Sequence, residues 1–188
     1  MGKPRQTMLT IVLGYNGTGK TTFVSKLVKN ELAGPRRRAL IITPDDREWN
    51  SVPYFNLRFP DRLGKFTGVR KIIAQKNTID IIRDHFYGGL LIFDDCRGYM
   101  KSYTDDDLHY LLIRRRQKEM DMVAVGHGFT EVPPKFFTFC SNIVLFQTKD
   151  NIYKRRDDLR NFEEMVQHQN RINKIAQQNK HYYEIIPT

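Results

Sequence analysis

The sequence predicts an α/β protein built on a mainly parallel sheet, and three observations lead to that prediction. Short apolar runs that suit buried strands alternate with longer segments that suit helices, as in parallel α/β sheets. A glycine-rich loop stands between the first apolar run and the first helical segment, an arrangement typical of phosphate-binding sites. The length of 188 residues and the hydrophobic content of 40% fit one globular domain, residues 1–188, with its core in about residues 8–147.

Five strands are predicted from continuous apolar runs, which are typical of strands buried on both faces. They cover residues 8–13, 39–43, 90–93, 122–125 and 143–146. Residues 181–186 predict a further short strand at an edge of the sheet.

Four helices are predicted from apolar side chains that repeat at helical spacing. They cover residues 22–32, 69–86, 104–116 and 155–178. Thr104, followed by Asp107, resembles a capping box at the start of the third helix. Residues 44–68 show no regular pattern and predict an exposed loop insertion. The C-terminal helix and edge strand, within residues 151–188, are expected to lie beyond the core.

The run Gly14-Tyr15-Asn16-Gly17-Thr18-Gly19-Lys20-Thr21 matches the phosphate-binding pattern G-x-x-x-x-G-K-[ST] at every fixed position. Glycines let backbone N–H groups close around phosphates, and the following helix N-terminus favours negative charge. Lys20 is expected to reach the β- and γ-phosphates of ATP, and the Thr21 hydroxyl to ligate Mg²⁺. The residues expected to contact the nucleotide are Gly14, Asn16, Gly17, Thr18, Gly19, Lys20, Thr21 and Thr22.

Two acids and a histidine follow two of the predicted strands. Asp94 stands where a Walker B acid stands and is expected to hold Mg²⁺ through water. Asp95 is expected to activate the water that attacks the γ-phosphate, and a turn aspartate is the alternative interpretation. His127 lies between two glycines at the end of the following strand, where it is expected to contact the γ-phosphate or the attacking water. A structural histidine is the other interpretation.

Three consecutive arginines, Arg114, Arg115 and Arg116, close the third predicted helix. In one interpretation they are solvated charges at a helix C-terminus. In the other, Arg115 or Arg116 is an arginine finger supplied to the ATP site of a neighbouring subunit. Arg97 is a rival finger because it follows the Walker B acids closely.

The chain carries a formal net charge of +10, with 31 basic and 21 acidic residues. The basic residues are concentrated in residues 1–38 and 58–76. A positive field of this kind favours a polyanionic partner such as nucleic acid, and an ordinary basic surface is the alternative.

Other sequence features exclude several classes of protein. Cys96 and Cys140 are isolated, so neither a disulfide framework nor a zinc site is expected. No apolar run reaches the roughly 18 residues of a membrane helix, and the N-terminus lacks the apolar core of a signal peptide. A cytoplasmic protein is therefore expected.

Taken in order, these motifs resemble the FtsK/HerA-type P-loop ATPases. Within that group the chain is most similar to the small genome-packaging ATPases of prokaryotic viruses and to the Zot-like phage assembly ATPases. The resemblance covers roughly residues 8–147. It rests on the glycine loop, a strand ending Thr43-Pro44, the run from Leu90 to Asp95, the arginine triplet, and the run from Val123 to Gly128.

The resemblance implies a RecA-like ASCE domain with three α/β/α layers, which assembles into hexameric rings and translocates DNA. It makes Lys20 and Thr21 the phosphate and Mg²⁺ contacts, Asp94 the Walker B acid, Asp95 the catalytic acid and His127 the polar sensor. The family usually has Glu at the position of Asp95 and commonly Gln at that of His127, so the chain departs from it at both places. Unlike typical Zot-like proteins, the chain shows no membrane span.

The sequence therefore predicts a Mg²⁺-dependent ATPase that moves DNA in viral or phage genome packaging, with a capsid or assembly protein as a further partner. One alternative is a small nucleotide or nucleoside kinase, for which Asp45-Asp46-Arg47 is the candidate acceptor-binding acid–arginine pair. Another is an assembly protein that binds ATP as a structural ligand and does not translocate DNA.

Overall fold

The computed structural model describes residues 6–100 and 105–188, so the predicted Thr104 cap lies outside the described residues. Within them, the strands form one sheet in the order β3-β2-β4-β5-β1-β6-β7. Neighbouring strands are parallel except β7, which is antiparallel to β6. The strands are β1 (Leu9–Leu13), β2 (Arg38–Thr43), β3 (Gly68–Ile73), β4 (Gly89–Phe93), β5 (Met120–Gly126), β6 (Asn142–Phe146) and β7 (Tyr183–Pro187). The predicted parallel sheet and the predicted C-terminal edge strand are confirmed.

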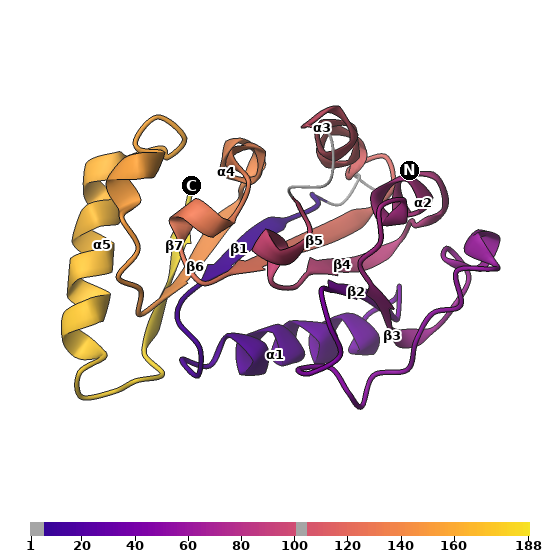
Figure 1. Ribbon diagram of the computed structural model, residues 1–188, viewed down its shortest axis with the longest axis horizontal. Coiled ribbons are helices and arrows are strands. Elements are labelled where there is room, and N and C mark those ends of the chain that lie inside the picture. The colour runs from indigo at the N-terminus through magenta and orange to yellow at the C-terminus, as the bar shows by residue number, and fades with distance from the viewer. Residues whose placement is uncertain (1–5, 101–104) are drawn as a thin grey trace.

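Helices cover both faces of this sheet (Figure 1). The helices are α1 (Lys20–Ala33), α2 (Thr78–His85), α3 (Asp105–Arg114), α4 (Pro134–Phe139) and α5 (Phe162–Ile175). Helix α1 lies below the sheet in the view of Figure 1, whereas α2, α3 and α4 lie above it and α5 runs beside β7. The three-layer α/β/α arrangement is confirmed.

The two faces of the sheet bury two separate hydrophobic clusters because successive strand side chains point to opposite sides. Leu91 packs into the cluster under α2, α3 and α4, whereas Ile92 packs into the cluster over α1. Both side chains are fully buried, and burial of each contributes about 1.5–3 kcal/mol.

The helix predicted over residues 69–86 is wrong. Its first part is the edge strand β3, which pairs with β2 so that Val69 lies opposite Ala39 and Ile72 opposite Ile42. Only the second part is helical, as α2. Apolar residues at positions 69, 72 and 73 fit a helical stripe, but β-branched Val and Ile also favour a strand that can pair with a neighbour.

The C-terminal helix is shorter than predicted, and one helix is absent from the prediction. Residues 152–155 form a 3₁₀ turn, and α5 begins only at Phe162. Asn161 has a φ of 52°, and this left-handed backbone separates the two pieces. Helix α4 was not predicted because its run of aromatic residues shows no helical spacing.

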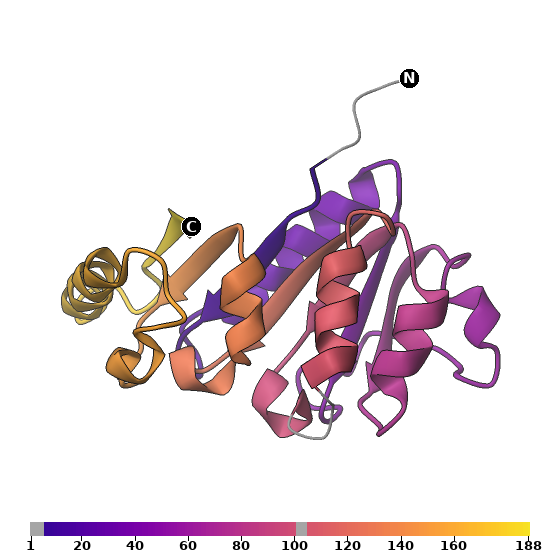
Figure 2. The same cartoon turned by 90° about the horizontal axis from the view of Figure 1, so that it is seen from above.

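The parallel strands bring distant residues to one edge of the sheet. The loop after β1, Asp94 after β4 and His127 after β5 all follow carboxyl ends of adjacent strands. Figure 2 shows these strand ends side by side along one edge of the sheet. In open α/β sheets this edge is where ligands bind.

None of the helices in residues 6–100 and 105–188 combines the length and the apolar character that a membrane crossing requires.

Candidate functional site

The glycine loop between β1 and α1 has a backbone that its sequence requires. Gly14, Gly17 and Gly19 have φ values of 155°, 72° and 108°, in the region that favours glycine. A Cβ atom on Gly14 would also lie 2.5 Å from Cβ of Phe146, which is closer than two carbon atoms can pack. The loop shape is therefore built into these glycines.

Lys20 begins α1, and its ammonium group folds back into the loop. The Nζ atom donates to the carbonyl oxygens of Gly14, at 2.6 Å, and Tyr15, at 2.9 Å. Burial lowers the pKa of Lys20, and the nearby carboxylates of Glu48, Asp94 and others oppose that shift. A buried cation at a helix N-terminus suits the phosphates of a nucleotide, which would replace the loop carbonyls as its partners.

Thr21 contacts a residue that the sequence analysis did not select. Its hydroxyl donates to Oε2 of Glu48 at 2.8 Å. Glu48 comes from the loop between β2 and β3, which was predicted as an irregular insertion and in which only Asp45-Asp46-Arg47 was selected. A hydroxyl that gives its proton to a carboxylate keeps its oxygen lone pairs for a hard cation, so Thr21 and Glu48 together fit Mg²⁺.

Asp94 is buried at the end of β4 and is held by Trp49 from the same loop as Glu48. The Trp49 indole N–H donates to Oδ2 of Asp94 at 2.7 Å. Burial, together with the neighbouring charges of Glu48 and Asp95, raises the pKa of Asp94 to about 6, although the Trp49 hydrogen bond and the Lys20 charge act in the opposite direction. A carboxylate that is this costly to ionise without a cation is suited to hold one.

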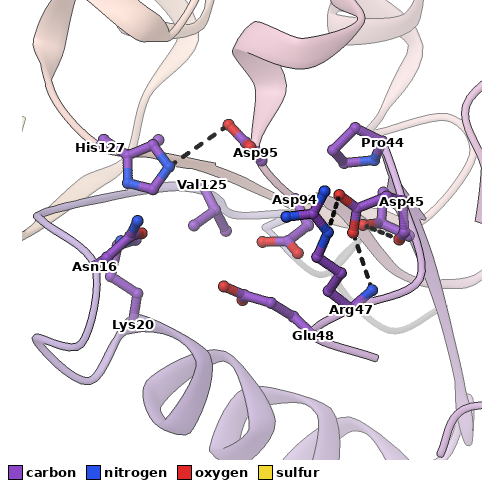
Figure 3. A pocket seen from close by; sticks show the side chains of 12 residues that line it. Asn16, Lys20, Pro44, Asp45, Arg47, Glu48, Asp94, Asp95, Val125 and His127 are labelled. Carbon is purple, nitrogen blue, oxygen red and sulfur yellow. Dashed lines mark hydrogen bonds and ion pairs between the residues drawn. The ribbon is translucent and has the colours of Figure 1, made fainter. Parts of the chain in front are cut away.

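Asp95 and His127 face each other across the same edge of the sheet (Figure 3). The Nε2 atom of His127 lies 3.8 Å from Oδ1 of Asp95. Asp95 has a left-handed backbone, with a φ of 45°. A non-glycine residue in this conformation is costly and is often found at functional sites.

Glu131 stands behind His127 and is a second carboxylate that the sequence analysis missed. It accepts from the backbone N–H of His127 at 3.1 Å and pairs with Arg97 at 2.7 Å. Candidate ligand atoms of Asp95, His127 and Glu131 lie within 4.8 Å of one another. Because Arg97 pairs with Glu131, its guanidinium is engaged within the same chain.

Lys20, Glu48, Asp94, Asp95 and His127 line one cavity of about 200 Å³ (Figure 3). Of the residues predicted for ATP binding and hydrolysis, Asn16, Lys20, Asp94, Asp95 and His127 line it. Its remaining lining comes mainly from the ends of β2 and β5 and from the loop that carries Asp45, Arg47 and Glu48.

Other predicted site residues lie elsewhere. The Thr18 hydroxyl donates to the Tyr15 carbonyl at 2.8 Å, so it stabilises the loop itself. Thr22 lines a different cavity, on the side of the loop that faces β7.

The arginine triplet lies at the opposite edge of the sheet from this cavity. The backbone N–H of Met120, the first residue of β5, donates to the carbonyl of Arg115. Strand β5 has seven residues, so its two ends are about 20 Å apart. Arg115 is half-buried and Arg116 is exposed. Neither guanidinium reaches this cavity within the same chain.

The C-terminal segment also meets the glycine loop, which the sequence analysis did not predict. The Nδ1 atom of His181 lies 3.1 Å from the carbonyl oxygen of Thr18. Nothing local in the sequence indicates this contact, because the two residues are 163 positions apart. The role of Trp49, by contrast, could have been suspected from the sequence. Trp49 is the one tryptophan of the chain and stands beside acids in an otherwise irregular segment.

Comparison with known proteins gives similarity in structure alone. No protein-family model and no curated protein matches the sequence. The genome packaging NTPase B204 from Sulfolobus turreted icosahedral virus 2, solved in complex with AMPPCP, matches with a TM-score of 0.72 and 12% identity, over 97% of this chain and 98% of that chain. The DNA-packaging ATPase B204 from Sulfolobus Turreted Icosahedral Virus matches with a TM-score of 0.67 and 13% identity, over 96% of this chain and 98% of that chain.

A more distant match is the pair of ATPases 2 and 3 of Thermomonospora curvata EccC. The TM-score is 0.50 at 11% identity, over 81% of this chain and 31% of that chain. The match to the viral proteins extends along nearly the whole of both chains. The resemblance inferred from the sequence is thus confirmed in the fold: the chain has the P-loop NTPase fold of viral genome-packaging NTPases.

Proposed function

We propose that this protein is a Mg²⁺-dependent ATPase, a single-domain motor that translocates DNA during viral genome packaging. The observation that carries the proposal is the cavity in which the loop lysine, Lys20, faces two carboxylates from one strand end, Asp94 and Asp95. The fold around it matches a packaging NTPase solved with an ATP analogue over 97% of the chain.

In the proposed reaction, Lys20 and the loop N–H groups hold the β- and γ-phosphates. Thr21 and Asp94, with Glu48 beside them, would hold Mg²⁺, which would supply positive charge beside the phosphates. Asp95 accepts a proton from water as the water oxygen bonds to the γ-phosphorus. The bond to the bridging oxygen breaks, and ADP and phosphate leave. His127 orients the water or reports the γ-phosphate, because its ring faces Asp95 across the cavity.

The proposal also concerns assembly. Arg115 and Arg116 lie far from the ATP site of their own subunit, so an arginine finger on this helix end would have to act on a neighbour. Exposure favours Arg116 over Arg115, whose Nε atom is buried without a hydrogen-bond partner. We propose a ring, most simply a hexamer, in which each subunit completes the next.

DNA is the proposed track because the chain is strongly basic, with a net charge of +10. A motor that moves along any sequence should contact the phosphate backbone, where Lys and Arg bind without reading bases. On this proposal the protein acts in the host cytoplasm or at the assembling virion, where a capsid or assembly protein is the further partner.

A small-molecule kinase is the second candidate, and one observation favours it. The predicted acid–arginine pair is formed, since Arg47 lies 3.3 Å from Asp45, and both residues line the cavity. Both are also exposed, and an exposed pair holds an acceptor only weakly.

Radiolabelled ATP separates the candidates. We expect the wild-type protein to release inorganic phosphate with Mg²⁺, and to transfer none to a panel of nucleotides and nucleosides. Lys20→Ala should abolish the release and leave the melting temperature of the nucleotide-free protein unchanged. Transfer to an acceptor would establish the kinase, whereas ATP binding with neither release nor transfer would indicate an assembly protein that uses ATP as a structural ligand.

A further inference from the structure

A second cavity, of about 330 Å³, lies on the other side of the glycine loop from the cavity that contains Asp94. The two cavities share no lining residue. The second is lined by Gly19, Thr22, Phe23, Lys26, Phe146, His181 and Tyr183. We propose that it binds the base and ribose of the nucleotide whose phosphates occupy the loop. This inference rests on the proposed function, and it assigns the part of the ligand that the loop motif does not determine.

The position of the second cavity follows the direction in which a nucleotide must run. Lys20 and Asp94 define the γ-phosphate side of the loop. A nucleotide bound there extends along the N-terminus of α1, past Thr21, and Thr22 is the next residue of that helix. Thr22 lines the second cavity, so the chain of phosphates leads from one cavity into the other.

The lining suits a heteroaromatic ring. The rings of Phe146 and Tyr183 lie 4.8 Å apart between centroids, and those of Phe23 and Tyr183 lie 5.3 Å apart. The exposed imidazole of His181 adds another flat surface. Such groups bind flat π-systems by stacking, which contributes beyond the area that is buried.

A glycine keeps the passage between loop and cavity open. A Cβ atom on Gly19 would lie 3.4 Å from Nδ1 of His181 and 3.5 Å from Cε1 of Phe146. Any larger side chain would fill the space where the loop meets the aromatic rings. Gly19 therefore serves the cavity as well as the loop.

The fold holds the C-terminal wall of this cavity in place. Tyr183 is paired with Phe146 in the antiparallel register of β7 and β6. The Nδ1 atom of the His181 ring lies within hydrogen-bond distance of the Thr18 carbonyl oxygen in the loop. The ammonium of Lys180 lies above Gly17, 3.0 Å from where a Cβ atom on that glycine would be. Lys180 thus stands beside the glycine loop, and Lys26 lines the cavity one helical turn beyond Thr22.

The chemistry of the lining also predicts the specificity. Among the side chains that line the cavity, only Thr22, Lys26, His181 and Tyr183 carry polar groups, and none is an amide or a carboxylate. A site rejects a ligand strongly only when it is built to hydrogen-bond a particular group on the right one. We therefore expect purine nucleotides to be preferred through stacking, with less than about tenfold discrimination between ATP and GTP.

Inorganic tripolyphosphate is the probe that isolates this cavity, since it has the phosphates of ATP and no base or ribose. Binding of Mg²⁺–AMPPCP and of Mg²⁺–tripolyphosphate is measured by calorimetry for each variant. His181→Ala and Tyr183→Leu should weaken AMPPCP binding about five- to 100-fold and leave tripolyphosphate binding within about twofold, as loss of one stacking partner predicts. Tyr183→Phe keeps the ring and should bind AMPPCP as the wild type does.

Two controls separate this inference from the proposed function. Lys20→Ala should lose affinity for both ligands, and if it loses neither, the loop is not the phosphate site and the proposed function fails. Tyr153→Ala removes an aromatic ring that is 66% exposed elsewhere on the surface and should change neither affinity. Equal weakening of both ligands in His181→Ala, or unchanged AMPPCP binding in both cavity variants, would overturn the assignment of the base site.

Discussion

At the scale of single residues, Asp94 shows how the fold prepares the site for a cation. Its carboxyl is buried beneath Trp49, with a pKa of about 6 against an ordinary value near 3.8. An acid whose pKa is raised by folding binds its proton more tightly in the folded state than in the unfolded state. Asp94 therefore lowers the free energy of unfolding as pH rises from about 4 to 6, and the full cost remains above that range.

We predict that Asp94→Asn stabilises the nucleotide-free protein by about 2 kcal/mol at pH 7, because the amide keeps an acceptor for Trp49 and carries no charge. The gain should shrink towards zero at pH 4, where the wild-type carboxyl is protonated. Urea unfolding at several pH values measures it, with the exposed Asp61→Asn as control. An Asn variant that is less stable than the wild type at pH 7 would contradict the proposed cost of ionising Asp94.

Asp95 and Glu48 are rival candidates for activating water, and the sequence predicted only the first. We expect Asp95→Asn to bind Mg²⁺–ATP and to hydrolyse it about 100-fold or more slowly, as loss of a general base does. Glu48→Gln keeps an acceptor for Thr21 and should mainly raise the Mg²⁺ concentration needed for half-maximal rate. Single-turnover hydrolysis over a Mg²⁺ titration distinguishes them. If Glu48→Gln is slow at saturating Mg²⁺ and Asp95→Asn is not, Glu48 is the base.

The distance in sequence between contacting residues explains which site residues could be predicted. The loop from Gly14 to Thr21 lies within eight consecutive positions, so its chemistry appears as a motif. Glu48 meets Thr21 from 27 positions away and His181 meets Thr18 from 163 away, through loops whose paths depend on the whole fold. Contacts of that kind leave no periodic trace in the sequence.

At the scale of elements, the buried strands and the C-terminal edge strand were predictable, and the edge strand β3 was not. Central strands such as β4 are covered on both faces, so their continuous apolar runs were recognised. The edge strand β3 has a mixed pattern, and only its pairing with β2 distinguishes it from the start of a helix. Tertiary pairing overrode the local pattern there.

The stability of the other edge of the sheet, formed by β7, depends on Glu184. The Arg171 guanidinium, together with hydrogen bonds from His168 and Tyr182, lowers the pKa of Glu184 to about 2. A depressed pKa contributes stability that is present above about pH 4.5 and is lost as pH falls towards 2. Arg171 and His168 belong to α5, so this carboxylate joins α5 to β7.

We predict that Glu184→Gln lowers the free energy of unfolding by about 2 kcal/mol at pH 7, since charge-assisted hydrogen bonds are lost. The difference from wild type should diminish below pH 4. Hydrogen exchange should be accelerated by Glu184→Gln, relative to the wild type, more in β7 and α5 than in β4. Unchanged exchange in β7 would show that the pairing of β6 with β7 is sufficient to hold this edge.

At the scale of the whole molecule, the proposed finger role of Arg116 predicts ATP sites shared between subunits, because Arg116 lies far from the cavity of its own chain. An arginine finger contributes about 10³–10⁵ in rate, so a monomer should bind ATP and hydrolyse it poorly. Arg116→Ala should be inactive alone and should regain activity when mixed with Lys20→Ala, because an intact loop then meets an intact finger. Arg115→Ala, at the neighbouring and less exposed arginine, is the matched control variant for Arg116→Ala. Turnover that is independent of protein concentration, with no rescue on mixing, would favour a monomeric enzyme.

The positive charge of the molecule predicts how it holds DNA. Log K should fall with log salt by close to one unit for each phosphate neutralised, and sequence should matter little. Fluorescence anisotropy with two unrelated duplexes from 50 to 200 mM salt measures both. A flat salt dependence would count against backbone contacts.

The central claim, that this site hydrolyses ATP to move DNA, is tested most directly by the effect of DNA on phosphate release. We predict Mg²⁺-dependent phosphate release that double-stranded DNA of any sequence accelerates, and that Lys20→Ala abolishes with and without DNA. Release that ignores DNA, or that survives in Lys20→Ala, would contradict the account.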